Sequence, residues 1–129
     1  MVVRRNPAAS VQHQNLIAAM VKHYLGKGCR ELRADIGRLP RPAVIDGELG
    51  GFKPDLTCVV RGIPIIVEAE TADSLRTDHT SKQFLTFFDC AREIGGRFEV
   101  IVPRGSQDDA RDFLAELGIP EGGVAIWHT

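Results

Sequence analysis

The order of apolar segments in the sequence predicts an α/β protein with a mixed β-sheet flanked by helices. Two β-rich runs on either side of Arg61-Gly62 have the pattern of a hairpin, which gives the sheet an antiparallel part. Further along, a helical pattern lies between two strand patterns, and such a unit favours a parallel pair of strands. Helical segments before and after the hairpin are available to cover both faces of the sheet.

Composition is typical of a globular protein. The 129 residues, of which 43% are hydrophobic and 26% charged, predict one domain over residues 1–129. The net charge of −1 gives no sign of nucleic-acid binding from bulk charge, although a local basic patch would suffice. The cysteines have no metal or disulfide spacing; they are Cys29, Cys58 and Cys90.

The N-terminal residues do not have the pattern of a signal peptide. Arg4-Arg5 is followed by Asn6 and Pro7 instead of an apolar core, and no run in the sequence reaches transmembrane length. We therefore expect a cytoplasmic protein with no membrane partner.

The first half of the chain is predicted to begin with a loose leader over residues 1–9. Ser10 is a plausible cap for an amphipathic helix that ends near Gly26, because apolar residues recur there at three and four positions. Residues 29–36 alternate weakly and are predicted to form a strand. Residues 37–52 hold two prolines and four glycines and are predicted to be a long loop that borders the site.

The second half is predicted to alternate helices and strands after the hairpin. A polar connection over residues 73–80 leads to a helix over 81–94, and a short apolar strand follows over 98–102. Ser106 to Asp109 resembles a capping box at the start of another helix, which Gly118 ends. Residues 124–127 complete the pattern as a last strand.

The register of the hairpin decides which charged side chains meet. If Arg61-Gly62 forms a two-residue loop, Asp55 faces Glu68 and Lys53 faces Glu70. Alternation then places all four on one face, while a loop one residue longer would break the pairing. The opposite face is apolar and is expected to be core; it carries Leu56, Cys58, Val60, Ile63, Ile65, Val67 and Ala69.

Three carboxylates on one face repel one another, which destabilises the sheet unless another group compensates their charge. A divalent cation removes the repulsion, and Mg²⁺ (or Mn²⁺) prefers oxygen ligands from one or two carboxylates. Asp55 and Glu68 are expected to be close enough to share an ion, with the backbone carbonyl of Ala69 as a further ligand. Such an ion polarises a phosphoryl oxygen and activates a water molecule, which are the two needs of phosphodiester hydrolysis.

Pro54-Asp55, followed after about a dozen residues by Glu68-Ala69-Glu70 at the end of an apolar strand, resembles the PD-(D/E)XK nuclease superfamily. Type II restriction enzymes and Holliday-junction resolvases have this fold. The resemblance implies a restriction-endonuclease-like αβββαβ core over residues 10–102, with an extra C-terminal helix and strand. It also implies DNA as the partner and Asp55 and Glu68 as the metal carboxylates.

The sequence departs from the family pattern at Glu70, which stands where the family has its catalytic lysine. The segment VEAET resembles a variant that ends Glu-X-Glu-Thr, in which a lysine or glutamine from elsewhere takes the role. Lys53 is the candidate by hairpin geometry, whereas Lys82 and Gln83 are the candidates by resemblance. Some members place a glutamate of the first helix in the site; here that helix offers only Gln12, His13 and Gln14.

Two classes of function follow. One is a metal-dependent nuclease acting on DNA, which we expect to be a homodimer because a domain this small offers little surface for gripping DNA. The other is a nuclease fold without catalysis that binds nucleic acid or protein; hydrolysis of a small phosphate ester is a third and weaker option. The plain alternative for Glu68 and Glu70 is a solvated strand end. Arg30, Arg33, Arg38 and Arg41 are either a solvated face or a rim that contacts phosphates.

Overall fold

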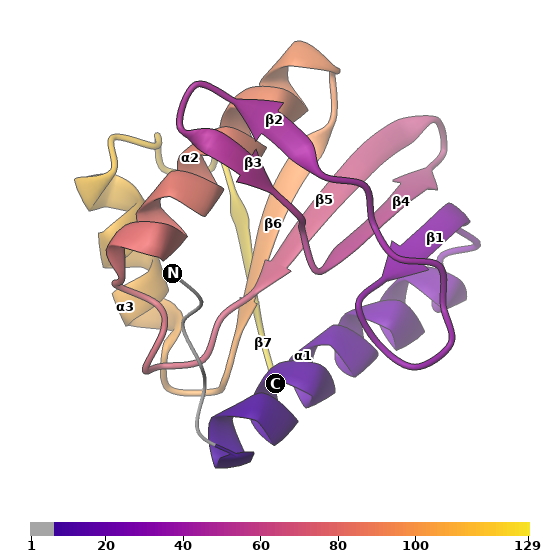
Figure 1. Ribbon diagram of the computed structural model, residues 1–129, viewed down its shortest axis with the longest axis horizontal. Helices are drawn as coiled ribbons and strands as arrows, with labels where there is room; N and C mark the ends of the chain where they lie inside the picture. The colour runs from indigo at the N-terminus through magenta and orange to yellow at the C-terminus, as the bar shows by residue number, and fades with distance from the viewer. Residues whose placement is uncertain (1–6) are drawn as a thin grey trace.

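The computed structural model describes residues 7–129. Its elements in chain order are α1 (Pro7–Gly26), β1 (Arg30–Ala34), β2 (Ile45–Gly47), β3 (Gly50–Phe52), β4 (Leu56–Val60), β5 (Ile63–Ala69), α2 (Asp78–Glu93), β6 (Arg97–Val102), α3 (Gln107–Glu116) and β7 (Ala125–His128). Figure 1 shows α1 lying across one face of the main sheet, with α2 and α3 together on the other.

The main sheet has five strands in the order β1-β4-β5-β6-β7. The first three pair antiparallel, and β5-β6 and β6-β7 pair parallel, each joined through a helix. Taken along the chain, α1, β1, β4, β5, α2 and β6 form the predicted αβββαβ core, to which α3 and β7 are added. The predicted fold class, a mixed sheet flanked by helices, is confirmed.

Two hydrophobic cores lie on the two faces of this sheet. The core under α1 is formed with the apolar face of the β4–β5 hairpin, as predicted from alternation. The core under α2 and α3 includes Phe84, Phe87 and Phe98, which are almost completely buried. Across residues 7–129, no helix is both long and apolar enough to cross a membrane.

The β4–β5 hairpin has the predicted register. Val60 pairs with Ile63, and the pairing continues without slippage to Leu56 and Val67. Arg61 and Gly62 form the two-residue loop, with φ angles of 51° and 80°. Positive φ at both positions is the requirement of the turn whose twist matches the two strands, which explains why the register is fixed.

Two boundaries differ from the prediction because a start signal lies earlier in the chain. Helix α1 begins at Pro7, a residue type favoured at the first helical position, so residues 7–9 are helical and Ser10 is no cap. The rest of the predicted leader, residues 1–6, lies outside the described residues. Helix α2 begins at Asp78, because the Thr77 side chain accepts a hydrogen bond from the backbone N–H of Thr80.

Two further predictions were wrong. Residues 45–52 of the predicted loop form the β2–β3 hairpin, whose paired Ile45 and Phe52 pack against the core under α2. The predicted capping box at the start of α3 does not form. Ser106 has a ψ of 2°, far from the extended conformation that aims a capping hydroxyl at the helix, and it makes no side-chain cap.

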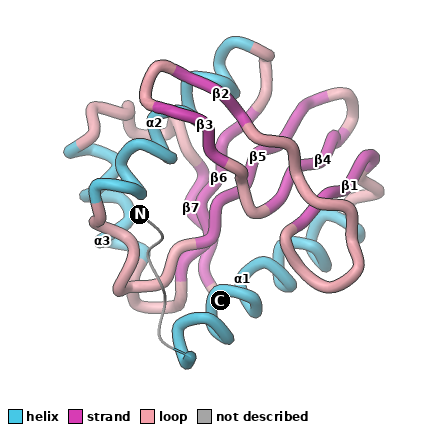
Figure 2. Tube along the Cα trace, in the orientation of Figure 1, coloured by secondary structure: helices cyan, strands magenta, loops and turns pink. Residues whose placement is uncertain are grey.

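The C-terminal end of α1 is tied to the sheet by a buried polar cluster. Glu99, on β6, is only 3% exposed and accepts a hydrogen bond from the Tyr24 hydroxyl. The indole Nε1 of Trp127 donates to the same carboxylate over 3.2 Å, and the His23 ring packs against both aromatic rings. This arrangement places Trp127 at the edge of the core. Figure 2 shows α1 and the C-terminal strand brought together.

Candidate active site

Asp55 and Glu68 meet where the β4–β5 hairpin opens. Continuing the observed register one step beyond Leu56 and Val67 places them opposite each other. The backbone N–H of Asp55 donates to Glu68 Oε1 over 3.1 Å, and the N–H of Ala69 donates to Asp55 Oδ2 over 2.8 Å. Each carboxyl group is therefore held by the backbone of the opposite strand.

Burial, neighbouring charge and hydrogen bonding shift the pKa values of the two carboxyl groups in opposite directions. Burial raises the pKa of Glu68 well above its usual range, and the negative charges of Asp55 and Glu70 raise it further. Burial alone would also raise the pKa of Asp55, but hydrogen bonds from His13, Glu68 and the Ala69 N–H outweigh it and lower that pKa. The surroundings therefore favour the ionised form of Asp55 and disfavour the ionised form of Glu68.

His13 of α1 is part of this cluster. Its Nε2 lies 3.1 Å from Asp55 Oδ2, and the imidazole is 14% exposed. The sequence alone indicates a surface or partly buried role for this histidine. The missed signal is spacing: His13 precedes Leu16, Ile17 and Met20 by three, four and seven residues, which places it on the buried face of the helix.

Glu70 is buried as well, at 2% exposure, so the alternative of a solvated strand end is wrong for both glutamates. Its Oε2 accepts a hydrogen bond from the Ser74 hydroxyl, and its backbone N–H donates to the carbonyl of Ile101 over 3.0 Å. The nearby Thr71 hydroxyl donates to Asp73. The turn after β5 thus folds back over Glu70 and encloses its carboxylate.

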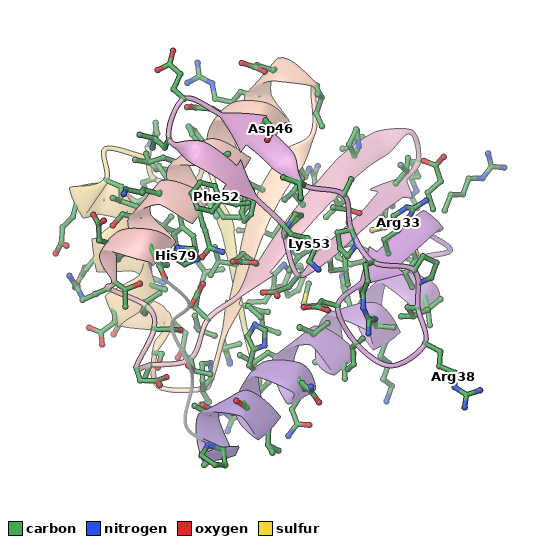
Figure 3. All side chains as sticks on the ribbon, viewed as in Figure 1. Arg33, Arg38, Asp46, Phe52, Lys53 and His79 are labelled. Atoms are coloured by element: carbon green, nitrogen blue, oxygen red, sulfur yellow. The ribbon has the colours of Figure 1, made fainter. Side chains whose placement is uncertain are left out.

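The three candidates for the missing lysine are placed differently. Lys53 is exposed and projects between the β2–β3 hairpin and α1 in Figure 3. Lys82 is held by Asp78, with 3.3 Å between Nζ and Oδ2, on the surface of α2. Gln83 is half-buried one residue further along that helix. Within residues 7–129, none of the three forms a hydrogen bond or ion pair with Asp55 or Glu68.

The β2–β3 hairpin forms a wall beside Lys53. Its last residue, Phe52, meets the His79 ring edge to face, with 5.5 Å between ring centroids. Figure 3 shows these two side chains next to each other, with Lys53 directly after Phe52 in the chain. His79 lies in the first turn of α2. The Phe52–His79 contact therefore packs the end of the hairpin, just before Lys53, against the start of that helix.

The four arginines suggested as a rim by the sequence differ in their contacts. Arg41 closes the loop before β2: its guanidinium donates to the carbonyls of Ala34, Ile36, Leu39 and Gly37, and it pairs with Asp35. Arg30, Arg33 and Arg38 are exposed. In Figure 3, Arg33 and Arg38 project outward on the β1 side of the molecule.

The donor set suits a hard divalent cation. Asp55 and Glu68 supply carboxyl oxygens, which are the ligands that such an ion prefers. Among the described residues, no three histidine, cysteine, aspartate or glutamate side chains are already arranged around a common metal position. A bound ion would therefore rest on two carboxylates, with water or substrate completing its shell, which is how Mg²⁺ is usually held.

Comparison with known proteins bears on the fold. No protein-family model and no curated protein matches the sequence. Among solved structures, the chain is similar to Pyrococcus furiosus SfsA in complex with Ca²⁺, with a TM-score of 0.51 and 18% sequence identity. The match covers 89% of this chain and 53% of that one, so this chain spans about half the length of the SfsA chain. At this identity, the likeness shows a shared fold.

Proposed function

We propose that this chain is a nuclease-like domain that hydrolyses phosphodiester bonds of DNA with Mg²⁺ or Mn²⁺. The observation that carries the proposal is the buried pair of Asp55 and Glu68, held opposite each other by the backbone of the hairpin. Burying two acidic groups together costs free energy unless something compensates them. In the proposed active form, a divalent cation compensates the two acidic groups.

Each residue of the cluster then has a role. Asp55 and Glu68 hold the ion, the Ala69 carbonyl is a further ligand, and His13 fixes the orientation of Asp55. The ion, when bound, supplies Lewis acidity toward a phosphoryl oxygen and lowers the pKa of a water molecule. Lys53 is the proposed cation that orients the phosphate, since it is exposed two residues before Asp55, whereas Lys82 is engaged with Asp78.

The Glu-X-Glu-Thr interpretation of the motif assigns Glu70 a position in the outer shell of the ion. The Ser74 hydroxyl already binds its carboxylate, so Glu70 would act through a water molecule. The structure of SfsA in complex with Ca²⁺ is in line with divalent-ion binding by this fold. We further propose a homodimer, because two copies would present two sites to the two strands of DNA.

A second candidate is a nuclease fold without catalysis that binds nucleic acid or protein. The observation that favours it is the glutamate in place of the catalytic lysine. Among residues 7–129, Lys53, Lys82 and Gln83 form no hydrogen bond or ion pair with Asp55 or Glu68. In this case Asp55 and Glu68 would bind no ion, and added Mn²⁺ would leave the stability of the protein unchanged.

Calorimetric titration with Mn²⁺ separates the two candidates. We expect binding by the wild type and its loss in Glu68→Gln and Asp55→Asn, which keep the size of the side chains but remove the ligand charge. Glu99→Gln is the matched control, because Glu99 is another glutamate at 3% exposure but lies in the Tyr24 cluster. Cleavage of linear, supercoiled and branched DNA is then measured for the same four proteins.

The outcomes distinguish the candidates. Binding and cleavage that both disappear in the Asp55 and Glu68 variants, but persist in Glu99→Gln, support the nuclease. If the wild type binds Mn²⁺ but cuts none of the DNA forms, the metal site is supported and the catalytic proposal is contradicted. No binding of Mn²⁺ and no thermal stabilisation by it supports the inactive module.

A further inference from the structure

Strand β1 is one edge of the main sheet, and two of its arginines belong to the face that carries the candidate site. Arg30 pairs with Val59 and Arg33 pairs with Thr57 on the neighbouring strand β4. Side chains of paired residues project to the same face of a sheet, and so do those of residues two apart along one strand. Asp55 lies two positions before Thr57, so both arginines share its face by alternation.

A β-bulge is what brings the two arginines to one face. Arg30 and Arg33 are three positions apart, a spacing that places side chains on opposite faces of a regular strand. The register shifts between them, so that three steps along β1 match two steps along β4. Glu31, inside the bulge, has a φ of 55°, which is uncommon for a residue other than glycine. Bulges often re-aim side chains next to active sites, and this one turns a second guanidinium group toward the face of Asp55.

These two arginines keep an uncompensated positive charge. Within the part of the chain that the structure describes, neither forms an ion pair. The arginines beside α3 differ, because Arg76 pairs with Glu116 and Arg111 pairs with Asp108. Unpaired positive charge therefore lies at the β1 edge, whereas the α3 side presents acidic side chains that already hold their cations.

The sheet face beside the two arginines is open. A groove of about 510 Å³ lies over β1, β4 and β5, and Arg33 lines it together with Thr57 and Val59. Of the described residues that line this groove, Glu31 alone is acidic. Packing thus leaves room for a ligand over the strand that carries the arginines, and the charge of the arginines favours an anionic one.

The arginines lie close enough to the candidate site to act with it. The backbone N–H of Asp35, directly after β1, donates to the carbonyl of Asp55 over 2.9 Å. Val59, the partner of Arg30, is four positions from Asp55, which corresponds to about 14 Å along a strand. One strand of duplex DNA carries a phosphate for about every 3.4 Å of the helix axis. A DNA strand with one phosphate at Asp55 can therefore place neighbouring phosphates at both arginines.

We propose that the face of β1 bearing Arg30 and Arg33 binds the phosphate backbone of the DNA segment that extends from the scissile bond toward the Arg61–Gly62 turn. This assignment rests on the proposed nuclease function and adds the direction in which the DNA lies across the domain. The guanidinium groups contact phosphates, so they hold the DNA in position without reading its sequence. The acidic side chains of α3 repel the same backbone.

The test is fluorescence anisotropy of a labelled DNA duplex, titrated with the whole chain in EDTA at several KCl concentrations. Without a divalent ion no cleavage occurs, and the slope of log K against log salt reports the number of phosphate contacts. We expect Arg30→Gln/Arg33→Gln to bind more weakly and to reduce the size of this slope by about 2. The same variant should bind Mn²⁺ like the wild type in calorimetry.

Two further variants control for net charge. Arg76→Gln/Arg111→Gln removes the same charge beside α3 and should keep the slope of the wild type. Glu31→Gln removes the negative charge of the groove and should bind DNA more tightly than the wild type, because a group that repels phosphates is lost.

Four results would overturn the proposal. They are no DNA binding by the wild type, an equal change of slope in the Arg76/Arg111 variant, and equally tight binding of polyglutamate. The fourth is a change of oligomeric state in the Arg30/Arg33 variant by analytical ultracentrifugation, which would make this edge a contact between copies. Intact cleavage by the Arg30/Arg33 variant with an unchanged slope would contradict this inference alone, whereas DNA binding without cleavage by the wild type would contradict the catalytic proposal alone.

Discussion

His13 Nε2 lies 3.1 Å from Asp55 Oδ2 and joins the first helix to the opening of the β4–β5 hairpin. The contact spans 42 positions of sequence and lies in a half-buried region. Asp55 Oδ2 also accepts the Ala69 N–H, so helix and strand hold the same carboxylate oxygen. An acidic side chain fixed by two elements keeps its orientation before a ligand arrives, which lowers the cost of binding.

Removal of this contact should weaken metal binding. We expect His13→Ala to lower the affinity for Mn²⁺ by about 10- to 100-fold, the usual effect of losing a residue that orients a metal ligand. The His13→Gln variant, whose amide can still donate to Asp55, should retain part of the affinity for Mn²⁺. Gln12→Ala, at the exposed neighbouring position, serves as the control. Wild-type affinity in His13→Ala would contradict the role given to the histidine.

The Tyr24–Glu99 bond should contribute to stability and not to metal binding. Tyr24→Phe leaves a buried carboxylate without one of its donors, which costs about 1–3 kcal/mol. Urea denaturation should show a lower midpoint with an unchanged slope. Calorimetry with Mn²⁺ on the folded variant checks the second half of the prediction; a loss of Mn²⁺ affinity would mean that the two polar clusters are coupled.

Cys58 should be unreactive at neutral pH. Burial raises the pKa of the Cys58 thiol to about 12, with a smaller contribution from the neighbouring Cys29. In a Cys29→Ala/Cys90→Ala variant, a thiol reagent at pH 8 should label the remaining cysteine only after unfolding in urea. Fast labelling of the folded variant would show that the thiol is accessible.

The same shift predicts how stability depends on pH. The folded pKa of Cys58 lies above that of the unfolded thiol, so the unfolded state loses its proton first as the pH rises from about 9 to about 12. The contribution of Cys58 to stability is therefore complete below pH 9 and falls across that window. A Cys58→Ala variant should show a smaller loss of stability over the same range.

Thr86→Val should stabilise the protein. The substitution keeps the shape of the side chain and removes a buried hydroxyl that has no partner among residues 7–129, which we expect to raise the free energy of unfolding by about 1 kcal/mol. Thr80 is the matched control on the same helix, because its hydroxyl donates to the Ser74 carbonyl over 2.7 Å. Thr80→Val should destabilise. Equal effects at both positions, measured by urea denaturation, would refute the assignment of Thr86 as unpaired.

The fold could be predicted from sequence because its signals are local. Arg61-Gly62 fixes the loop length, loop length fixes the register, and the register places Asp55 against Glu68. The β2–β3 hairpin could not be predicted in this way. Its strands have three residues each and contain Gly47, Gly50 and Gly51, so they depend on packing against α2 and not on strand propensity.

The candidate site was predicted where one hairpin contains it and missed where it depends on tertiary contacts. Asp55 and Glu68 follow from the pairing of adjacent strands. Predicting the role of His13 requires knowing where α1 crosses the sheet, because Asp55, its partner, lies 42 positions further along the chain. The choice among Lys53, Lys82 and Gln83 was open for the same reason: which of them lies near the carboxylates depends on how the β2–β3 hairpin and α2 pack.

The two polar contacts of α1 restrict how anything can reach the carboxylates. His13 binds Asp55 near the start of the helix, and Tyr24 binds Glu99 near its end, eleven positions and about 16 Å further along. A helix fastened at both ends cannot pivot away from the sheet without breaking one of these contacts. A ligand that approaches the carboxylates from the side of α1 therefore has to displace this helix and break at least one of the two contacts.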